Sequence, residues 1–195
     1  PDGDRAARKR EFGLGAAVLV HAGRLWRETQ IDVLIRAVAL LPAAELVLAG
    51  HGAARPALEA LARQLGVSAR VRFLGTLDHA RLARLFRASD LVAIASTSES
   101  QGMALLQAMA CGLPAVGARQ GPLLQYIPPE AGLLATPGEP AAFAVEIARL
   151  LDDAGLRARM GAAAAAFAAG FGVAPVAAAW RDIYRQAIDG SAPCV

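Results

Sequence analysis

The fold is decided by residues 91–114, which read LVAIASTSESQGMALLQAMACGLP. The first five residues form a short, wholly apolar run, which is typical of a strand buried on both faces of a parallel sheet. A polar loop follows over residues 96–102, and the next residues, as far as 111, are apolar or small except for Gln107. An apolar helix of this kind is expected to be buried. The stretch therefore predicts a strand, a loop and a buried helix, the unit of α/β domains.

The same alternation extends outward in both directions along the chain. Short apolar runs predict strands at residues 17–22, 45–49, 71–74, 91–95, 115–117 and 133–135. Apolar residues at helical spacing predict helices at 31–41, 55–65, 79–88 and 102–111, with a brief helical piece at 123–126. This alternation predicts an α/β fold with a doubly wound, Rossmann-like parallel sheet of about six strands.

From residue 140 the alternation stops. Three C-terminal helices are expected, over residues 140–151, 156–168 and 175–188. In the last of them Trp180 and Tyr184 lie four residues apart on one face, which we interpret as a packing stripe. The expected organisation is a linker with a short helix (1–15), one domain (16–188, with its C-terminal helices at 140–188) and a disordered tail (189–195).

Composition limits the class of protein. The chain has 195 residues, of which 55% are hydrophobic and 19% charged, so a buried core is expected and disorder is not. The formal charge is only +3 and aromatic residues are few, which argues against a nucleic-acid partner. No apolar run reaches the roughly 18 residues that a membrane helix needs, and the polar amino end does not resemble a signal peptide. A cytoplasmic location is expected.

Two further features concern surfaces and metals. The basic residues between positions 5 and 10 are interpreted as part of a solvated terminal helix. Peripheral contact with an anionic inner membrane is the less favoured alternative, and nothing else in the sequence supports it. Cys111 and Cys194 are too few for a disulfide framework and lack metal-ligand spacing, so we expect no metal and no cofactor.

Ligands of open parallel sheets bind beyond the carboxyl ends of the strands, so the loops there are the candidate site. The loop over residues 96–102 ends in Gly102 at a helix start, where free N–H groups and partial positive charge suit a phosphate. A helix cap explains Ser98 or Ser100 but not Glu99, which would repel a phosphate unless it faces hydroxyl groups. A sugar attached to a diphosphate offers both kinds of group.

Two more side chains are candidates. Gln107 needs a polar partner within its apolar helix, and this is either a neighbouring loop or ligand hydroxyls in the cleft. Arg24, in Gly23-Arg24-Leu25 after the first strand, offers a fork of donors to phosphate oxygens, although arginines at strand ends are often surface residues. The stretch Gly50-His51-Gly52 lacks the third glycine of the dinucleotide fingerprint and is interpreted as a tight turn.

On the basis of these residues and the motifs around them, the chain resembles the carboxy-terminal domain of retaining group-1 glycosyltransferases. This domain is one half of the GT-B fold, and the resemblance covers about residues 17–188. The family shows a glutamate, a glycine three residues on, a second glutamate eight residues after the first, and then Ala-Met-Ala-Cys-Gly-x-Pro. Glu99 and Gly102 match here, and residues 108–114 read AMACGLP. Supporting matches are Gly23-Arg24-Leu25, DVLIRA at 32–37, VRFLG at 71–75, ASDL at 88–91 and GLL at 132–134.

The resemblance implies a role for each matching position. Arg24 would hold the donor diphosphate and Glu99 would accept hydrogen bonds from the donor sugar, so these two are the expected catalytic residues. Leu77 lies where such enzymes contact the base, and Gln107 lies where the second glutamate would bind ribose. The expected donor-binding set is Arg24, Thr29, Leu77, Glu99, Ser100, Gln101, Gly102, Met103, Ala104, Leu105 and Gln107.

Two of these positions depart from the family pattern. Thr29 stands where a lysine usually neutralises the diphosphate, and Gln107 stands where the second glutamate is usual. Each change removes a charge, and we expect each to weaken donor binding by about 1–3 kcal/mol.

The resemblance implies retaining transfer from a nucleotide-diphosphate sugar, a UDP- or GDP-sugar, to a glycan, lipid or small-molecule acceptor. The acceptor would be held by an amino-terminal domain in the same or another chain, so the isolated chain is expected to be inactive. One alternative is a degenerate, non-catalytic nucleotide-binding or assembly module, which Thr29 and Gln107 favour. A nucleotide-sugar epimerase is less favoured because His21, His51 and His79 are interpreted as turn or surface residues.

Overall fold

The computed structural model describes residues 2–97 and 102–189, with side chains from Arg5 onward. Its strands are β1 (Ala17–Ala22), β2 (Ala44–Ala49), β3 (Val71–Gly75), β4 (Leu91–Ile94), β5 (Ala115–Ala118) and β6 (Gly132–Ala135). They form one sheet in the order β3-β2-β1-β4-β5-β6, and every neighbouring pair is parallel. The order reverses between β1 and β4, which confirms the predicted doubly wound sheet.

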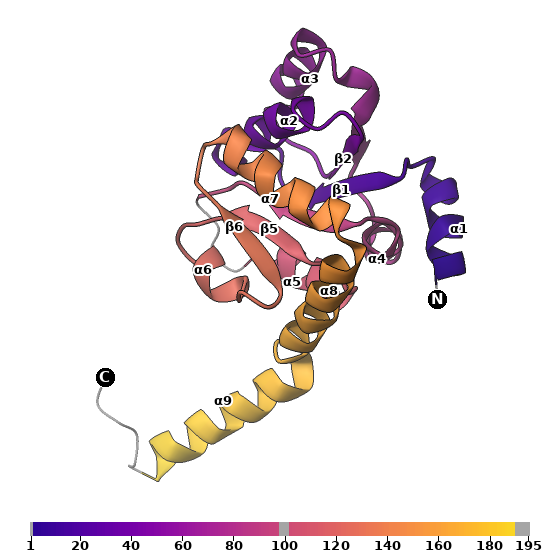
Figure 1. Cartoon of the computed structure of the whole chain (residues 1–195). Coiled ribbons are helices and arrows are strands. Elements are labelled where there is room, and N and C mark those ends of the chain that lie inside the picture. Colours follow the sequence, from indigo (N-terminus) through magenta and orange to yellow (C-terminus); the bar gives the residue numbers. More distant parts are fainter. Residues whose placement is uncertain (1, 98–101, 190–195) are drawn as a thin grey trace.

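Helices cover both faces of this sheet (Figure 1). They are α1 (Asp2–Phe12), α2 (Ile31–Ala39), α3 (Arg55–Gln64), α4 (His79–Ala88), α5 (Met103–Ala110), α6 (Leu123–Tyr126), α7 (Pro140–Asp152), α8 (Ala154–Ala169) and α9 (Val173–Ile188). Two short 3-10 turns, η1 (Arg27–Thr29) and η2 (Ser68–Arg70), were not predicted. Helix α2 packs against α7, α1 against α4, and α5 against α8.

The predicted elements are all present, with differences at their ends. The first predicted helix ends at Ala39 instead of Leu41, because the N–H groups of Leu40 and Leu41 bond three residues back, as in a 3-10 turn. The helix after β4 begins at Met103, because Gly102 caps it in the left-handed conformation, with φ +55°. The core lies between the layers, where β4 and β5 are buried along their whole length.

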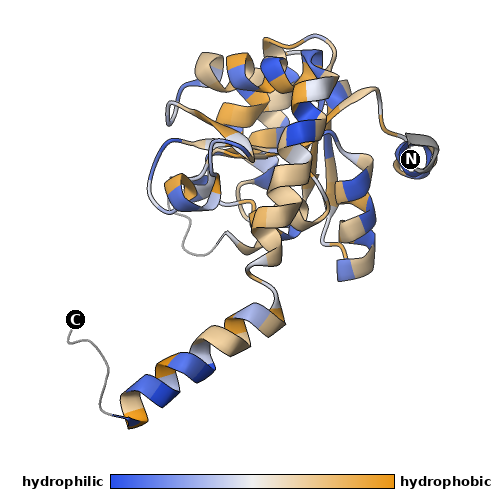
Figure 2. Cartoon of the chain, turned by 60° about the horizontal axis from the view of Figure 1, so that its bottom comes forward, coloured by the Kyte–Doolittle hydropathy of each residue, from blue (hydrophilic) through white to orange (hydrophobic). Residues whose placement is uncertain are grey.

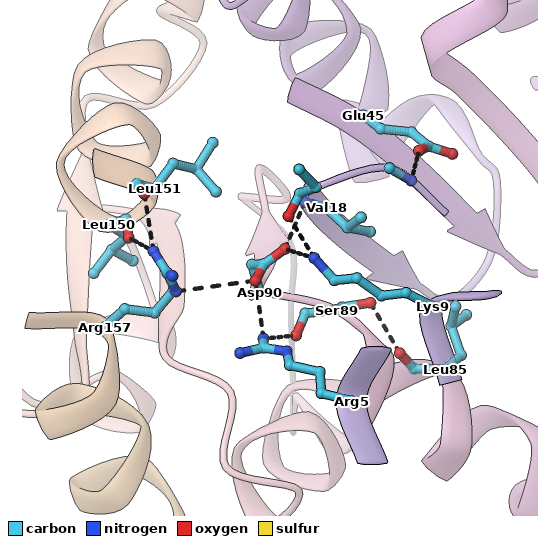
Figure 3. A network of polar contacts seen from close by, with 12 residues as sticks. Arg5, Lys9, Val18, Glu45, Leu85, Ser89, Asp90, Leu150, Leu151 and Arg157 are labelled. Carbon is cyan, nitrogen blue, oxygen red and sulfur yellow. Dashed lines mark hydrogen bonds and ion pairs between the residues drawn. The ribbon is translucent and has the colours of Figure 1, made fainter. Parts of the chain in front are cut away.

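Asp90, at the amino end of β4, is the centre of a buried ionic network (Figure 3). One carboxylate oxygen lies 2.7 Å from Lys9 Nζ and accepts a hydrogen bond from the Val18 N–H at 2.8 Å. The other lies 3.1 Å from Arg5 Nη2 and 3.9 Å from Arg157 Nε. A buried carboxylate requires cations and donors of this kind. The interpretation of the basic residues as part of a solvated terminal helix is therefore wrong for Arg5 and Lys9, which attach α1 to the sheet, whereas Arg10 is exposed.

Helix α9 extends away from the body of the molecule (Figures 1 and 2). None of its residues is buried. Its large apolar side chains are exposed: Val173, Val176, Trp180, Ile183, Tyr184 and Ile188. The rings of Trp180 and Tyr184 contact each other, with centroids 5.7 Å apart. Trp180 and Tyr184 therefore share one face of α9, as predicted, but the described part of this chain does not pack against that face.

The length and apolar character of the helices bear on whether any of them could cross a membrane. Among the described helices, none is by itself long and apolar enough to cross a membrane; α8 and α9 taken together, with a bend of 42° between them, meet those two criteria.

Candidate functional site

A cavity of about 450 Å³ lies at the carboxyl edge of the sheet, between the loops that follow β1 and β4. Its walls include five residues of the predicted set: Arg24, Thr29, Gly102, Ala104 and Leu105. The two loops are far apart in the sequence, and they meet because the strand order reverses between β1 and β4. This is the place where ligands bind in doubly wound sheets.

The backbone on both sides of Arg24 is fixed by hydrogen bonds to the neighbouring loop. The N–H of Gly23 donates to the carbonyl of Ala49, and the N–H of Leu25 donates to the carbonyl of His51, each at 2.9 Å. The backbone that carries Arg24 is thus fixed, so less backbone entropy is lost when this turn binds an anion.

Two glycines permit this close contact of loops. A Cβ on Gly50 would lie 1.8 Å from the carbonyl oxygen of Gly23, and a Cβ on Gly52 would lie 2.2 Å from that of Leu25. Gly50 also has a φ of +144°, a conformation that favours glycine. The Gly50-His51-Gly52 stretch is therefore a turn, as predicted, and its glycines also allow the loop that carries Arg24 to pack closely against it.

Thr29 and Gln30 form the end of η1 beside the cavity. The Thr29 hydroxyl donates to the Trp26 carbonyl oxygen at 2.6 Å, so its hydrogen is not offered to a phosphate in this conformation. Gln30 has a φ of +49° and a buried Oε1 that no described residue hydrogen-bonds. A left-handed glutamine is strained. Thr29, at the position of the usual lysine, therefore offers the cavity no cation. Arg27 of the same turn lines a different cavity.

The start of α5 forms the wall opposite Arg24. Its N-cap is Gly102, which has no side chain to cap the first turn. Gly102, Ala104 and Leu105 line the cavity, so the positive end of this helix is directed to it. The predicted residues Ser98, Glu99, Ser100 and Gln101 lie outside the described residues.

A second cavity, of about 270 Å³, adjoins the first. It shares Arg24 and Ala104 with the first cavity and is lined by Leu77, which was predicted to contact a base. At its edge His51 Nδ1 lies 2.9 Å from Thr76 Oγ1. Apolar walls with a polar edge suit a flat aromatic ring.

The structure does not bring Gln107 into either of these cavities. Its half-buried side chain lines a separate cavity of about 460 Å³, together with Met103 and Leu106 of the same helix and Tyr126 of α6. Met103 is exposed, so α5 is not buried on all sides as expected from its composition. The side of α5 that carries Gln107 faces α6 and the junction of α8 with α9, not the cleft.

His21 is a residue of the site that sequence reasoning missed. It was interpreted as a turn or surface residue, but it lies inside β1, is only 2% exposed and lines the first cavity. Its Nδ1 lies 3.1 Å from the carbonyl oxygen of Ala93, and burial lowers the pKa of its ring. The available signal was a polar residue inside an apolar strand, two positions before Gly23.

Comparison with known proteins assigns the family. The model of the family described as glycosyl transferases group 1 matches residues 3–167. The chain belongs to the group 1 glycosyltransferases. A D-inositol 3-phosphate glycosyltransferase 2 of Catenulispora acidiphila is 39% identical to it in an alignment 203 residues long, which covers 96% of this chain and 48% of the relative.

Solved structures of glycosyltransferases share the fold of this group 1 chain. Sucrose-phosphate synthase from Thermosynechococcus elongatus has a TM-score of 0.87 at 29% identity, covering 95% of this chain and 49% of the synthase. Anabaena Alr3699/HepE, solved in complex with UDP-glucose, has a TM-score of 0.79 at 29% identity, covering 86% and 48% respectively. The match to about half of each neighbour identifies the present domain as the carboxy-terminal half of a GT-B fold.

The group 1 chain spans about half the length of the curated relatives it matches. Among its described residues, no three histidine, cysteine, aspartate or glutamate side chains converge as they would around a metal ion.

Proposed function

We propose that this chain is the donor-binding half of a retaining glycosyltransferase that transfers a sugar from a nucleotide-diphosphate sugar to an acceptor. The observation that carries the proposal is that Arg24 and the amino end of α5 line one cavity at the point where the strand order reverses. A guanidinium fork and a helix start both bind phosphate oxygens.

The order of the two cavities supports this ligand class. Arg24 lies on the wall that the first and second cavities share. A nucleotide sugar is arranged as base, ribose, diphosphate and sugar, so Arg24 would hold the diphosphate between a base at Leu77 and a sugar in the first cavity. Glu99 would accept hydrogen bonds from that sugar, as the family resemblance implies. Gln107 has no donor contact in this arrangement, because its side chain lines another cavity.

UDP-sugars are the favoured donors. The neighbour Alr3699/HepE was solved with UDP-glucose, and it matches 86% of this chain at 29% identity. We propose residues 16–188 as the donor-binding domain.

An amino-terminal, acceptor-binding domain is the proposed partner. The relatives are about twice as long as the matched region. The uncovered apolar stripe of α9 supports the presence of a further packing surface, because large exposed apolar faces mark interaction sites. Transfer would require this domain, so we expect the present chain alone to bind donor without transferring sugar.

Calorimetric titration of the chain with UDP, UDP-glucose and GDP-glucose tests the proposal. We expect UDP and UDP-glucose to bind, and Arg24→Ala to weaken both by at least about tenfold, because a charge-assisted hydrogen bond contributes about 1.5–3 kcal/mol. Arg63→Ala, which removes an exposed arginine from the end of α3, is the control with the same charge change. Absence of heat at millimolar nucleotide, with the chain shown to be folded, would refute the proposal.

A non-catalytic module of the same fold is the second candidate. Two observations favour it: the Thr29 hydroxyl already donates a hydrogen bond to the Trp26 carbonyl, and Gln107 lies outside the cleft. The two candidates differ in what Glu99 does in a protein that contains the acceptor-binding half. If Glu99→Ala left sugar transfer by that protein unchanged, the donor role of this loop would be excluded and the module reading favoured.

A further inference from the structure

The ring of His21 has one bonded and one unbonded nitrogen. Nδ1 lies 3.1 Å from the carbonyl oxygen of Ala93, on the neighbouring strand β4. Nε2 is buried and has no hydrogen-bond partner among the residues that the structure describes. A Cβ placed on Gly23 would lie 3.6 Å from Nε2, so this nitrogen lies next to the backbone that leads into Arg24. The residue that carries this nitrogen is also one of the residues that line the first cavity.

The hydrogen bond to Ala93 determines the tautomer. A carbonyl oxygen can only accept, so Nδ1 carries the hydrogen. A neutral imidazole has one N–H, which leaves Nε2 as a bare acceptor. Burial lowers the pKa of His21 below its ordinary value of about 6.5, and the bond to Ala93 offsets part of that effect. At neutral pH the ring is therefore uncharged, and Nε2 presents a lone pair.

Buried polar atoms in folded proteins are almost always paired, so an unpaired one at a cavity wall needs an explanation. A group of the ligand can supply the missing partner. That group must be a donor. The diphosphate oxygens of a nucleotide sugar carry no hydrogen near neutral pH, so they cannot bond to this lone pair. Hydroxyl groups of the hexose and of the ribose can.

Two charged residues line the same cavity as His21. One is Arg24, a permanent cation. Glu28 is the other ionisable residue among the described lining residues, and it belongs to η1.

We propose that His21 is a donor-positioning residue whose Nε2 accepts a hydrogen bond from a hydroxyl group of the bound nucleotide sugar. The inference rests on the donor-binding function proposed above. It adds a contact that orients the ligand in the cavity, whereas Arg24 supplies the charge that attracts it.

Calorimetry with UDP-glucose and UDP tests this contact on the wild-type chain, His21→Phe and His21→Gln. Phenylalanine keeps a planar ring without an acceptor, and we expect it to weaken UDP-glucose binding about three- to tenfold, the effect of one hydrogen bond. Glutamine offers an amide oxygen and should recover part of the loss. If the hydroxyl belongs to the hexose, UDP binding changes less than about twofold; if it belongs to the ribose, UDP binding falls by the same factor as UDP-glucose binding.

The dependence of affinity on pH separates this role from its main rival. Between pH 7.5 and 5.5 the diphosphate of UDP-glucose does not titrate, and Arg24 stays charged. Protonation of His21 would remove the lone pair, and burial lowers the pKa of the ring. Affinity should therefore not rise toward pH 5.5 in the wild type, and any fall should be absent in His21→Phe. Tighter binding at pH 5.5, with uptake of a proton, would mean that an imidazolium donates to phosphate, and it would overturn the proposal.

Two controls keep the result interpretable. His79→Gln changes an exposed histidine at the start of α4 and should leave both affinities unchanged. Nitrogen-15 NMR of the unliganded chain should show hydrogen on Nδ1 and none on Nε2 of His21; the opposite tautomer would overturn the proposal even if His21→Phe does not fold. Failure of the folded wild type to bind either nucleotide overturns the donor function as well, whereas normal binding by folded His21→Phe overturns only the role of His21.

Discussion

Replacing Asp90 by asparagine removes one charge from the network that attaches α1 and α8 to the sheet, with almost no change in side-chain size (Figure 3). The Asp90 side chain is only 6% exposed, and Lys9, at 2.7 Å, is 16% exposed. Asparagine can still accept the hydrogen bond from the Val18 N–H. It cannot balance the positive charges of Lys9, Arg5 and Arg157.

The expected cost follows from burial. Removing one partner of a fully buried ion pair costs about 3–5 kcal/mol, because the other charge is left without compensation. The three cations here keep some contact with water, which lowers the cost, so we expect Asp90→Asn to reduce the free energy of unfolding by about 2–4 kcal/mol. In the exposed pair Arg55–Glu59, with side chains 43% and 36% exposed, Glu59→Gln should cost less than about 1 kcal/mol.

Urea denaturation followed by far-ultraviolet circular dichroism measures both variants. We expect the midpoint of Asp90→Asn to fall with an unchanged denaturant slope, since the same surface is exposed on unfolding. Lys9→Met and the double variant complete a cycle that isolates the pair. A loss for Asp90→Asn that is no larger than that of Glu59→Gln would show that the network contributes no more than a surface ion pair, and the reasoning would be refuted.

Three further changes have defined outcomes. Gln30→Gly should raise the free energy of unfolding by about 1 kcal/mol in urea melts, because it relieves a left-handed backbone, whereas Gln30→Ala should bring no such gain. Gly50→Ala should lower the free energy of unfolding by more than about 3 kcal/mol, since its Cβ would lie 1.8 Å from a backbone carbonyl oxygen. Gly66→Ala, at a residue with φ +69° and open space around it, should lower it by only about 1 kcal/mol in the same assay. The pKa of His21 is lower in the folded than in the unfolded chain. The neutral ring therefore stabilises the fold above about pH 6.5, and this contribution is lost as the pH falls below that value. Urea melts at pH 7.5 and 5.5 should show that the free energy of unfolding falls less for His21→Phe than for the wild type.

The sheet and its helices were predictable because the signal is local. Strands such as β4 and β5 are buried on both faces and read as continuous apolar runs, and the helices between them keep an apolar period. The ends of elements depend on single hydrogen bonds, such as those of Leu40 and Leu41, which composition does not display. The partners of α1 were also hidden, because Lys9 and Asp90 are 81 residues apart.

The candidate site was predictable where it depends on topology. Arg24 and Gly102 follow strands that become neighbours, so both reach the same cavity. Gln107 was assigned to the cleft because it is the polar residue of an apolar helix, but a single sequence does not show which neighbour covers each side of that helix. His21 was missed because its importance lies in the unpaired nitrogen of a buried ring, which is visible only with atomic positions.

The loops after β1 and β2 pack closely against each other, and this limits which residues of the site can be substituted by design. Because Gly50 and Gly52 touch the carbonyls of Gly23 and Leu25, any side chain added there would displace the turn that presents Arg24. A library aimed at new nucleotide preferences should therefore keep both glycines fixed and diversify Leu77 and its neighbours on the far wall of the second cavity. Diversity confined to that wall would change ligand choice while leaving the anion-binding turn intact.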